Sequence, residues 1–302
     1  GLGLGILAGN VPALAVQVAL PALAVGRPVL LKSSRREPLL AAALVHLLTR
    51  ARPELATAVA AATWPGGDSS LEEELLATAR TVVAYGGRAA LSDLGRRHDE
   101  LVGRGPMVSL AVVGRDAAIA PTAAGLARDV ALFEQRGCLS VVAVWVEGGN
   151  DASEAEAADA MADAVAGELC SLADRWPPPR RDAATLAAVQ QMRRDAELRG
   201  ARVLPLEVAV GSVVSESDPH YRPVPEARFV RVHPTGALER LPPTLSPLAG
   251  HVQGVALAGE RAWSLAEDLE RLGVRRLARP GELQRPDALW ANGERHLIEE
   301  LV

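Results

Sequence analysis

Cysteine is scarce in this chain, with two residues, Cys138 and Cys170, among 302. Two cysteines exclude the dense disulfide framework of a small secreted protein, and no secretory leader is recognisable. We therefore expect a cytoplasmic protein with free thiols. The chain opens at Gly1 without a methionine, in a segment with the pattern of a strand, so we expect its N-terminus to be truncated.

Long apolar runs and an excess of positive charge are also missing. The most hydrophobic stretch, residues 11–31, is interrupted by glutamine, arginine, glycine and proline, so we expect a buried helix and strand and no membrane span. The net charge of −5 argues against nucleic acid as the main partner. The histidines lie far apart without the spacing of metal ligands, so we expect no metal site.

What the chain does contain is an alternation of short apolar strands and amphipathic helices. Over the first hundred residues the pattern predicts strands at 6–10, 28–34, 58–64 and 81–87, separated by helices. Such alternation is typical of a parallel sheet with helices on both faces. We therefore expect a Rossmann-like domain. The GLGLG run precedes the first expected strand, so it does not match a dinucleotide fingerprint, which must follow a strand.

A second α/β region follows a glycine- and proline-containing break near residues 103–106. Ser153 with Glu156 forms a capping box that predicts the start of a long helix. The pattern predicts strands at 107–114, 203–211, 229–234, 251–259 and 274–281, one further strand directly after Cys138, and helices at 121–136, 153–173, 182–200 and 260–273.

Cys138 stands where the expected helix ends at Gly137 and the next strand begins. A thiol at such a corner is exposed in a way that suits a covalent nucleophile, although a free cysteine is more often a small buried hydrophobe. Cys170 lies within an amphipathic helix, and we interpret it as a core residue.

Two further residues lie at predicted strand ends, where ligands collect in open α/β sheets. The Asn10 amide could donate a hydrogen bond to a developing oxyanion, or it could simply form a turn before a proline. Lys32 and the hydroxyls that follow it suit an adenosine ribose or phosphate; the alternative is a solvated loop.

Two glycine pairs occupy turns between a strand and a helix. Gly66 and Gly67 would let backbone N–H groups approach a phosphate at a helix N-terminus, although the charge of Asp68 opposes that. Gly86 and Gly87 have the same placement after the next strand. An ordinary turn explains either pair equally well.

Taken together, these segments resemble the aldehyde dehydrogenase superfamily and, within it, the fatty-acyl-CoA reductase family of bacterial bioluminescence. The resemblance covers nearly the whole chain in family order. It is carried by GNVP (9–12), PVLLKSS (28–34), TWPGGDSSLEEELL, TVVAYGG, FEQRGCLS with VAVWVEGG, and GVRRLARPGELQRPDALW.

The resemblance implies an aldehyde-dehydrogenase-like α/β fold and a site built around Cys138 as nucleophile, with Asn10 supplying the oxyanion-hole amide. It implies an NADP-binding Rossmann-like domain over 1–104, a catalytic domain over 105–278, and a C-terminal segment, 279–302, that returns to the first domain. The residues implied to lie along the cofactor are Lys32 and Ser33 at the adenosine ribose, with Gly66, Gly67, Gly86 and Gly87.

Two departures from the family pattern carry chemical meaning. Hydrolytic aldehyde dehydrogenases place a glutamate base just before the catalytic domain, whereas the corresponding stretch, GRGPMVSLAVVG, has none. Without that base to activate water, hydrolysis of the acyl-enzyme thioester is slow. Relatives that prefer NAD often carry a glutamate three places after the lysine. Arg35 stands there and would bind a 2′-phosphate, so we expect NADPH.

The resemblance thus favours NADPH-dependent reduction of a long-chain acyl-CoA, or of an acyl group delivered by a partner protein, to a fatty aldehyde. A homo-oligomer or a complex with acyl-transfer enzymes is consistent with the family, and luminescence is one fate of such an aldehyde. Two alternatives stay open. One is an aldehyde-oxidising dehydrogenase using Glu100, and the other is a truncated, non-catalytic relative that acts as a binding or assembly partner.

Overall fold

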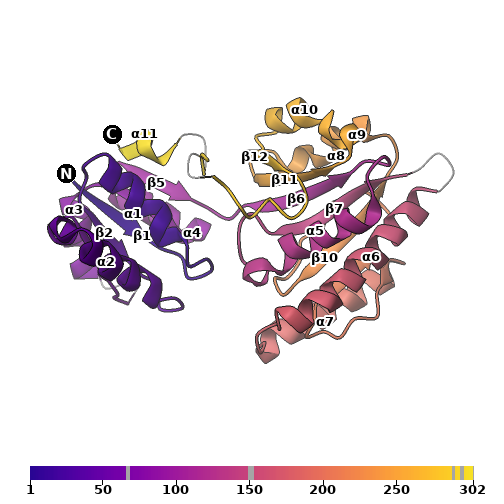
Figure 1. The fold of residues 1–302 in the computed structure, drawn as a ribbon, viewed down its shortest axis with the longest axis horizontal. Coiled ribbons are helices and arrows are strands. Elements are labelled where there is room, and N and C mark those ends of the chain that lie inside the picture. Colours follow the sequence, from indigo (N-terminus) through magenta and orange to yellow (C-terminus); the bar gives the residue numbers. More distant parts are fainter. Residues whose placement is uncertain (66–68, 149–152, 288–289, 293–295, 302) are drawn as a thin grey trace. The chain divides into compact units, whose positions relative to one another are not determined.

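The computed structural model describes residues 1–65, 69–148, 153–287, 290–292 and 296–301. The chain divides into two compact units. Unit 1 comprises Gly1–Pro106 with the segment from residue 289 to the end, and unit 2 comprises Met107–Ala288. Each unit is an α/β layer structure around one largely parallel sheet (Figure 1). The expected α/β class is therefore confirmed.

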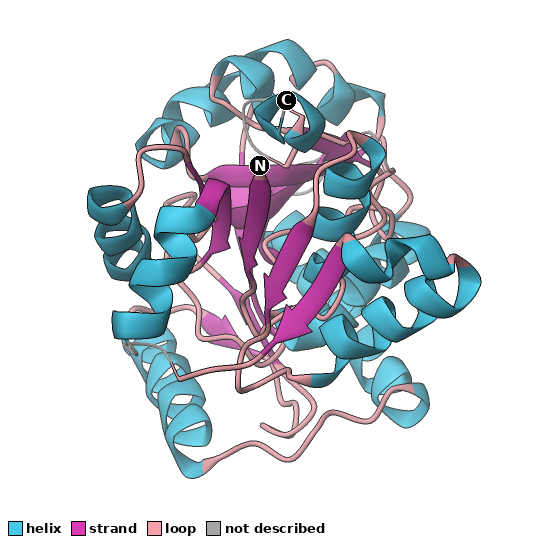
Figure 2. Ribbon diagram, turned by 90° about the vertical axis from the view of Figure 1, so that its left-hand side faces the viewer, coloured by secondary structure: helices cyan, strands magenta, loops and turns pink. Residues whose placement is uncertain are grey.

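Unit 1 contains a five-stranded parallel sheet in the order β3-β2-β1-β4-β5. Helices flank its strands on both sides (Figures 1 and 2). Apolar side chains of α1, α2 and α11 pack in one cluster with Val83, whereas those of α3 and α4 pack in another with Val82 and Ala84. The elements are β1 (Leu2–Ile6), α1 (Leu14–Ala24), β2 (Val29–Lys32), α2 (Leu39–Ala51), a 3₁₀ turn (Pro53–Thr57), β3 (Val59–Ala62), α3 (Ser69–Thr78), β4 (Ala79–Tyr85), α4 (Arg88–Arg97), β5 (Leu101–Arg104) and α11 (Leu297–Leu301).

Unit 2 contains a seven-stranded sheet in the order β12-β11-β6-β7-β10-β9-β8, in which only β8 runs antiparallel to its neighbour. The elements are β6 (Val108–Val113), α5 (Ile119–Ala131), a 3₁₀ segment (Leu132–Gln135), β7 (Val141–Glu147), α6 (Glu154–Arg175), α7 (Ala183–Leu198), β8 (Arg202–Val203), β9 (Ser212–Ser215), β10 (Phe229–Thr235), a 3₁₀ turn (Leu238–Arg240), α8 (Leu241–Leu245), a 3₁₀ turn (Ser246–Leu248), β11 (Val252–Ala258), α9 (Glu260–Trp263), α10 (Ala266–Arg271) and β12 (Arg276–Ala278).

The predicted helix start at Ser153 is confirmed. Its hydroxyl accepts a hydrogen bond from the Glu156 backbone N–H, and the Glu156 carboxylate accepts one from the Ser153 N–H at 2.7 Å. This capping box satisfies two backbone donors that would otherwise lack partners at the start of α6.

The first strand was predicted too late in the chain. It spans Leu2–Ile6, so the GLGLG run lies largely inside it. Glycine disfavours a strand by propensity, but Gly5 is required by packing, because a Cβ there would lie 2.9 Å from Val18 of α1 and 3.1 Å from Leu31 of β2. A close helix-to-sheet contact therefore overrides the local preference.

Other boundaries in unit 2 also differ from the prediction. The strand expected at 203–211 reduces to its first residue in β8, because Pro205 cannot donate to a ladder, and the next strand, β9, begins only at Ser212. The helix expected at 260–273 is divided into α9 and α10. The short edge strand β5 escaped prediction, since it has only four residues.

Candidate active site

The segment before Cys138 is not the helix end that the sequence predicted. The helix α5 ends at Ala131, and Phe133, Glu134 and Gln135 follow with φ of 54°, 55° and 63°. Each left-handed non-glycine residue costs on the order of 1–3 kcal/mol, so such a run persists only when surrounding contacts hold it. Cys138 itself lies in the turn before β7. It therefore does not follow directly on the negative end of a helix.

Gln135 holds this segment through its side-chain amide. Its Nε2 donates to the carbonyls of Val141 at 2.8 Å and Phe229 at 2.6 Å, and its Oε1 accepts from the Phe229 N–H at 2.7 Å. Val141 begins β7 and Phe229 begins β10. The buried amide thus joins the starts of two neighbouring strands.

A buried ion pair holds the same segment next to Gln135. Arg228, only 2% exposed, donates through Nε to Glu134 at 2.9 Å and through a terminal nitrogen to the Trp176 carbonyl at 3.0 Å. Arg181 lies 3.7 Å from the same carboxylate. Two arginines therefore compensate the charge of Glu134 in an environment that would penalise it alone.

The Cys138 thiol is half-buried, and desolvation raises its pKa to about 11. The backbone N–H groups of Cys138 and Leu139 hydrogen-bond the sulfur and act in the opposite direction, lowering the pKa. The Cys138 carbonyl accepts a hydrogen bond of 2.7 Å from the hydroxyl of Ser109, a fully buried residue of β6. The amide donors, rather than a neighbouring cation, are what this turn offers a thiolate.

Asn10 lies in unit 1, in the loop between β1 and α1, where it is exposed. Since β1 ends at Ile6, Asn10 stands beyond the strand end on which the sequence placed it. The loop is fixed by its neighbour Gly9. A Cβ on Gly9 would lie 2.5 Å from the Ser34 hydroxyl and 2.7 Å from the Cβ of Arg36.

The loop after β2 carries the residues predicted at the adenosine end of a cofactor. Lys32 closes β2 as predicted, and its ammonium lies 5.1 Å from the centre of the Trp64 ring. Ser33 is buried. The chain then forms a tight turn closed by a bridge between Ser34 and Glu37, which leaves the Arg35 side chain exposed.

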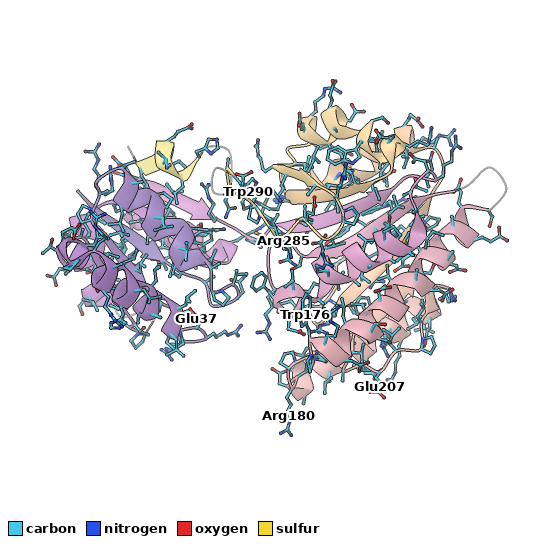
Figure 3. All side chains as sticks on the ribbon, in the orientation of Figure 1. Glu37, Trp176, Arg180, Glu207, Arg285 and Trp290 are labelled. Atoms are coloured by element: carbon cyan, nitrogen blue, oxygen red, sulfur yellow. The ribbon has the colours of Figure 1, made fainter. Side chains whose placement is uncertain are left out.

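Glu37 is the carboxylate nearest in sequence to Arg35, and it is engaged elsewhere. Its Oε1 accepts from the backbone N–H groups of Leu39 at 3.1 Å and Leu40 at 2.9 Å, at the start of α2 (Figure 3). The Glu37 carboxylate is thus held at the start of α2, and the exposed Arg35 guanidinium carries the charge that an anion at this turn would bind.

Gly86 and Gly87 follow β4 at the same carboxyl edge of the sheet, and Gly87 is the N-cap of α4 with no side-chain cap. A Cβ at Gly87 would meet no other atom within 4 Å, so the protein itself does not require glycine there. Open space beside uncapped helix N–H groups suits the close approach of a phosphate. Gly66 and Gly67, the other predicted pair, lie outside the described residues.

Glu100, the residue on which the aldehyde-oxidising alternative depends, lies at the opposite edge of the unit 1 sheet. It directly precedes β5, and its carboxylate is 3.5 Å from the Thr81 hydroxyl near the start of β4. Arg27, which precedes β2, donates to the same hydroxyl at 3.0 Å. All three residues thus gather at the amino ends of the strands, away from the edge that carries Lys32 and Gly87.

Several residues that hold the Cys138 segment were missed by the sequence analysis. Gln135, Arg228 and Ser109 lie far apart in sequence. Ser109 carried a signal, because it is the only polar residue of its strand, whereas Gln135 and Arg228 carried no local signal of their burial. The Glu226 carboxylate lies 3.4 Å from the Arg136 guanidinium beside the same segment.

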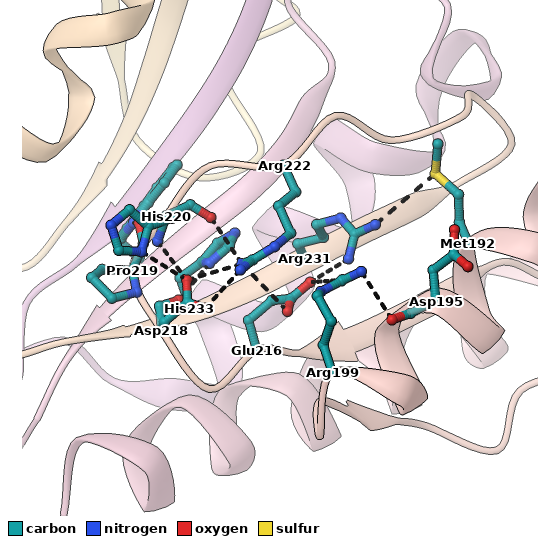
Figure 4. A network of polar contacts seen from close by, with 11 residues as sticks. Met192, Asp195, Arg199, Glu216, Asp218, Pro219, His220, Arg222, Arg231 and His233 are labelled. Atoms are coloured by element: carbon teal, nitrogen blue, oxygen red, sulfur yellow. Dashed lines mark hydrogen bonds and ion pairs between the residues drawn. The ribbon is translucent and has the colours of Figure 1, made fainter.

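A second group of titratable residues lies apart from Cys138, between β9, β10 and α7 (Figure 4). The buried Glu216 carboxylate pairs with Arg231 and lies 3.4 Å from Arg199 and 3.6 Å from Arg222. His233 stacks on Trp145 with ring centres 4.9 Å apart, and burial lowers its pKa to about 4. These contacts are internal to the fold, and they fix the segment that follows β9.

Two kinds of site are absent from the described residues, a metal site and a membrane-spanning helix. No group of histidine, cysteine, aspartate and glutamate side chains there is arranged to hold a metal ion. Within the same residues, no helix is both long and apolar enough to cross a bilayer.

Comparison with known proteins places the chain in a family. The family described as acyl-CoA reductase (LuxC) matches residues 1–296. The long-chain acyl-protein thioester reductase of Vibrio harveyi is 29% identical over 154 residues, which are 49% of this chain and 32% of that protein. The long-chain acyl-protein thioester reductase 2 of Photobacterium leiognathi is 25% identical over 201 residues, 65% of this chain and 41% of that protein. The chain thus spans less than half the length of either relative.

Solved structures resemble this chain at lower identity. An NAD-dependent benzaldehyde dehydrogenase from Corynebacterium glutamicum has a TM-score of 0.70 at 17% identity, covering 100% of this chain and 66% of that one. The glyceraldehyde-3-phosphate dehydrogenase GapN of Methanocaldococcus jannaschii, complexed with NADP, has a TM-score of 0.73 at 13% identity, covering 95% and 65%. These likenesses confirm the predicted aldehyde-dehydrogenase-like fold. With that fold and a family match over almost its whole length, the chain belongs to the acyl-CoA reductase (LuxC) family.

Proposed function

We propose that this chain reduces a long-chain acyl thioester to the fatty aldehyde, with Cys138 as the nucleophile and NADPH as the reductant. The observation that carries the proposal is the turn at Cys138, in which a half-buried thiol faces two backbone N–H groups just before β7. The curated relatives are named for acyl-protein thioester reduction, which supports this substrate class.

The first chemical step forms a new thioester on the protein. The Cys138 sulfur attacks the acyl carbonyl, the bond from carbon to the original sulfur breaks, and the thiol proton leaves with that sulfur as a free thiol. Asn10 would donate its side-chain amide to the oxyanion that develops during the attack. The acyl group comes from acyl-CoA or from an acyl-donor protein.

The second step depends on keeping water from the acyl-enzyme. The segment GRGPMVSLAVVG, where hydrolytic relatives carry a glutamate base, offers no carboxylate. Without a base to activate water, the thioester lasts long enough to be reduced, and release of the aldehyde returns the Cys138 thiolate.

The residues of unit 1 fit a phosphorylated nicotinamide cofactor. Lys32 and Ser33 would hold the adenosine ribose, Arg35 the 2′-phosphate, and Gly86 and Gly87 would lie along the phosphates. The fit rests on the exposed Arg35 guanidinium and on the open space at Gly87. When bound, the cofactor supplies the hydride. Gly66 and Gly67 belong to the same proposal by sequence position alone.

The aldehyde-oxidising alternative has less support. It needs a general base at the acyl-enzyme, and its candidate, Glu100, lies at the amino edge of the unit 1 sheet rather than at the carboxyl edge. The remaining alternative, a non-catalytic binding partner, predicts that Cys138 takes up no acyl group.

Acylation followed by reduction tests the proposal. The protein is incubated with a long-chain acyl-CoA, and intact-mass and peptide analysis locate the acyl group. NADPH is then added and the aldehyde is measured. We expect one acyl group on Cys138 and its release as aldehyde.

Two variants make the test specific. Cys138→Ser should abolish both steps, whereas Cys170→Ser should leave both unchanged, because Cys170 is exposed on α6 and not in the core, where the sequence analysis wrongly placed it. Release of acid instead of aldehyde would select the oxidising alternative. A protein that stays folded but takes up no acyl group would refute the catalytic proposal.

A further inference from the structure

Two left-handed segments of unit 2 are joined next to Cys138. One comprises residues 133–135, and the other comprises Ala227 with φ of 82° and Arg228 with φ of 55°. The Glu134–Arg228 ion pair links the two segments, and the hydrogen bonds between Gln135 and Phe229 link them again one residue further on. Neither segment adopts this conformation by preference, so each depends on the contacts with the other.

The Gln135 side-chain amide takes the place of direct backbone hydrogen bonds between β7 and β10 at the start of the two strands. The strands β7 and β10 pair from Ala143 with Arg231 onward. Extending that register back by two residues brings Val141 opposite Phe229, and these are the two residues whose backbone groups Gln135 bonds. A primary amide has the donors and the acceptor of a peptide group, so it can complete the ladder from outside the strands.

The carbonyl of Cys138 is tied to a third strand. The Ser109 hydroxyl of β6 donates to it at 2.7 Å, and Ser109 is completely buried. The turn that carries the thiol is therefore fixed on both sides, by Gln135 three residues before Cys138 and by Ser109 at Cys138 itself. Between these anchors, the N–H groups of Cys138 and Leu139 keep their direction toward the sulfur.

We propose that Gln135 is a positioning residue for the Cys138 thiol, supported by Ser109, and that its two amide donors are what hold the thiol in its reactive geometry. This inference rests on the proposed role of Cys138 as the nucleophile. It assigns to Gln135 no contact with the substrate. Its effect is on where the sulfur lies and how strongly the thiol is desolvated.

The isosteric substitution Gln135→Glu separates positioning from simple packing. Glutamate keeps the volume and the acceptor oxygen, but at neutral pH it donates no hydrogen bond to the Val141 and Phe229 carbonyls. If Gln135 only fills space, the variant behaves like the parent protein. If its donors hold the turn, the variant behaves like Gln135→Ala.

The measurement follows alkylation of Cys138 by iodoacetamide as a function of pH, in the full chain carrying Cys170→Ser so that one thiol remains. Burial is the largest cause of the raised thiol pKa, so a loosened turn should shift the midpoint of the alkylation profile to lower pH, by about one pH unit. In the same variants, acylation by acyl-CoA should slow by on the order of 10- to 100-fold, because a displacement of about 1 Å costs a reaction that much.

A lower pH midpoint of alkylation together with a slower acylation identifies positioning. A general loss of folded protein would slow acylation without shifting the midpoint. Gln191→Ala, at an exposed position of α7, is the matched control and should change neither the alkylation midpoint nor the acylation rate. Ser109→Ala removes a single buried hydroxyl, and it should move both measurements in the same directions as the Gln135 variants. It decides the matter if those variants do not fold.

The inference is overturned if Gln135→Glu or, where that variant is unfolded, Ser109→Ala keeps both the alkylation midpoint and the acylation rate of the parent. Failure of the proposed function looks different. In that case the parent protein accepts no acyl group from acyl-CoA, yet the alkylation profiles still show whether Gln135 and Ser109 position the thiol.

Discussion

Asp129 is a buried carboxylate that links α5 to the segment after β12, and its raised pKa gives a quantitative prediction of how stability depends on pH. It is completely buried, one carboxylate oxygen accepts from the Gly281 N–H at 2.6 Å, and the other lacks a hydrogen-bond partner within the described residues. Burial, the largest cause, raises its pKa from 3.8 to about 6, although the Gly281 hydrogen bond opposes the shift.

The sign of the effect follows from proton linkage. The folded state holds the Asp129 proton more tightly than the unfolded state, so ionisation destabilises the fold as the pH rises from about 4 through about 6. At pH 8 the charged side chain lowers the free energy of unfolding by about 3 kcal/mol relative to a neutral one, and at pH 5 by about half of that.

The perturbation is Asp129→Asn, which removes the charge and keeps an acceptor for Gly281. We expect its free energy of unfolding, relative to the parent protein, to rise by about 1.5 kcal/mol between pH 5 and pH 8. Urea denaturation at several pH values gives that difference. If the new amide donor destabilises the fold, it should lower the free energy of unfolding by the same amount at every pH and leave the dependence on pH unchanged.

The control is Asp195→Asn, which removes an exposed carboxylate from α7 and changes the net charge equally. Its relative stability should not vary with pH in the same window. The reasoning is refuted if Asp129→Asn also shows no pH dependence, or if its relative stability falls as the pH rises.

Four other substitutions test the cofactor turns, the Asn10 loop and the buried network. Arg35→Glu should lower the ratio of kcat/KM for NADPH to that for NADH by at least about tenfold, since a carboxylate repels a 2′-phosphate, whereas Arg50→Glu on the exposed face of α2 should not. Gly9→Ala should destabilise unit 1 by about 1–3 kcal/mol in thermal unfolding, because its Cβ would lie 2.5 Å from the Ser34 hydroxyl. Gly87→Ala, where the Cβ is unobstructed, should leave stability unchanged and weaken NADPH binding; equal stability losses in the two alanine variants would contradict this. Glu216→Gln should lower the free energy of unfolding by about 3 kcal/mol, because Arg231 loses its buried counterion, and a change below about 1 kcal/mol would show that the neighbouring arginines leave little net charge to compensate.

The sequence by itself was sufficient for the class of fold and for the family. Parallel strands buried on both faces must be apolar throughout, and the helices between them must be amphipathic, so the alternation is visible without any tertiary information. The start of α6 was equally predictable, since its capping box is made by Ser153 and Glu156 alone.

Where prediction failed, distant contacts override local preference. Gly5 lies in β1 because α1 packs closely on the strand there. The helix expected up to Arg136 stops at Ala131 because Gln135 and Glu134 are bonded to residues nearly a hundred positions away. No local pattern reports such pairings.

For the candidate site, the sequence singled out the proposed nucleophile, and the tertiary structure showed which residues hold it. Cys138 could be selected from its motif, because the chemistry of a thiol belongs to the residue. Its desolvation, the direction of its backbone N–H groups and its anchors at Gln135 and Ser109 arise only when β6, β7 and β10 lie side by side. Burial and hydrogen bonding are properties of a residue's neighbours in space, and only folding determines those neighbours.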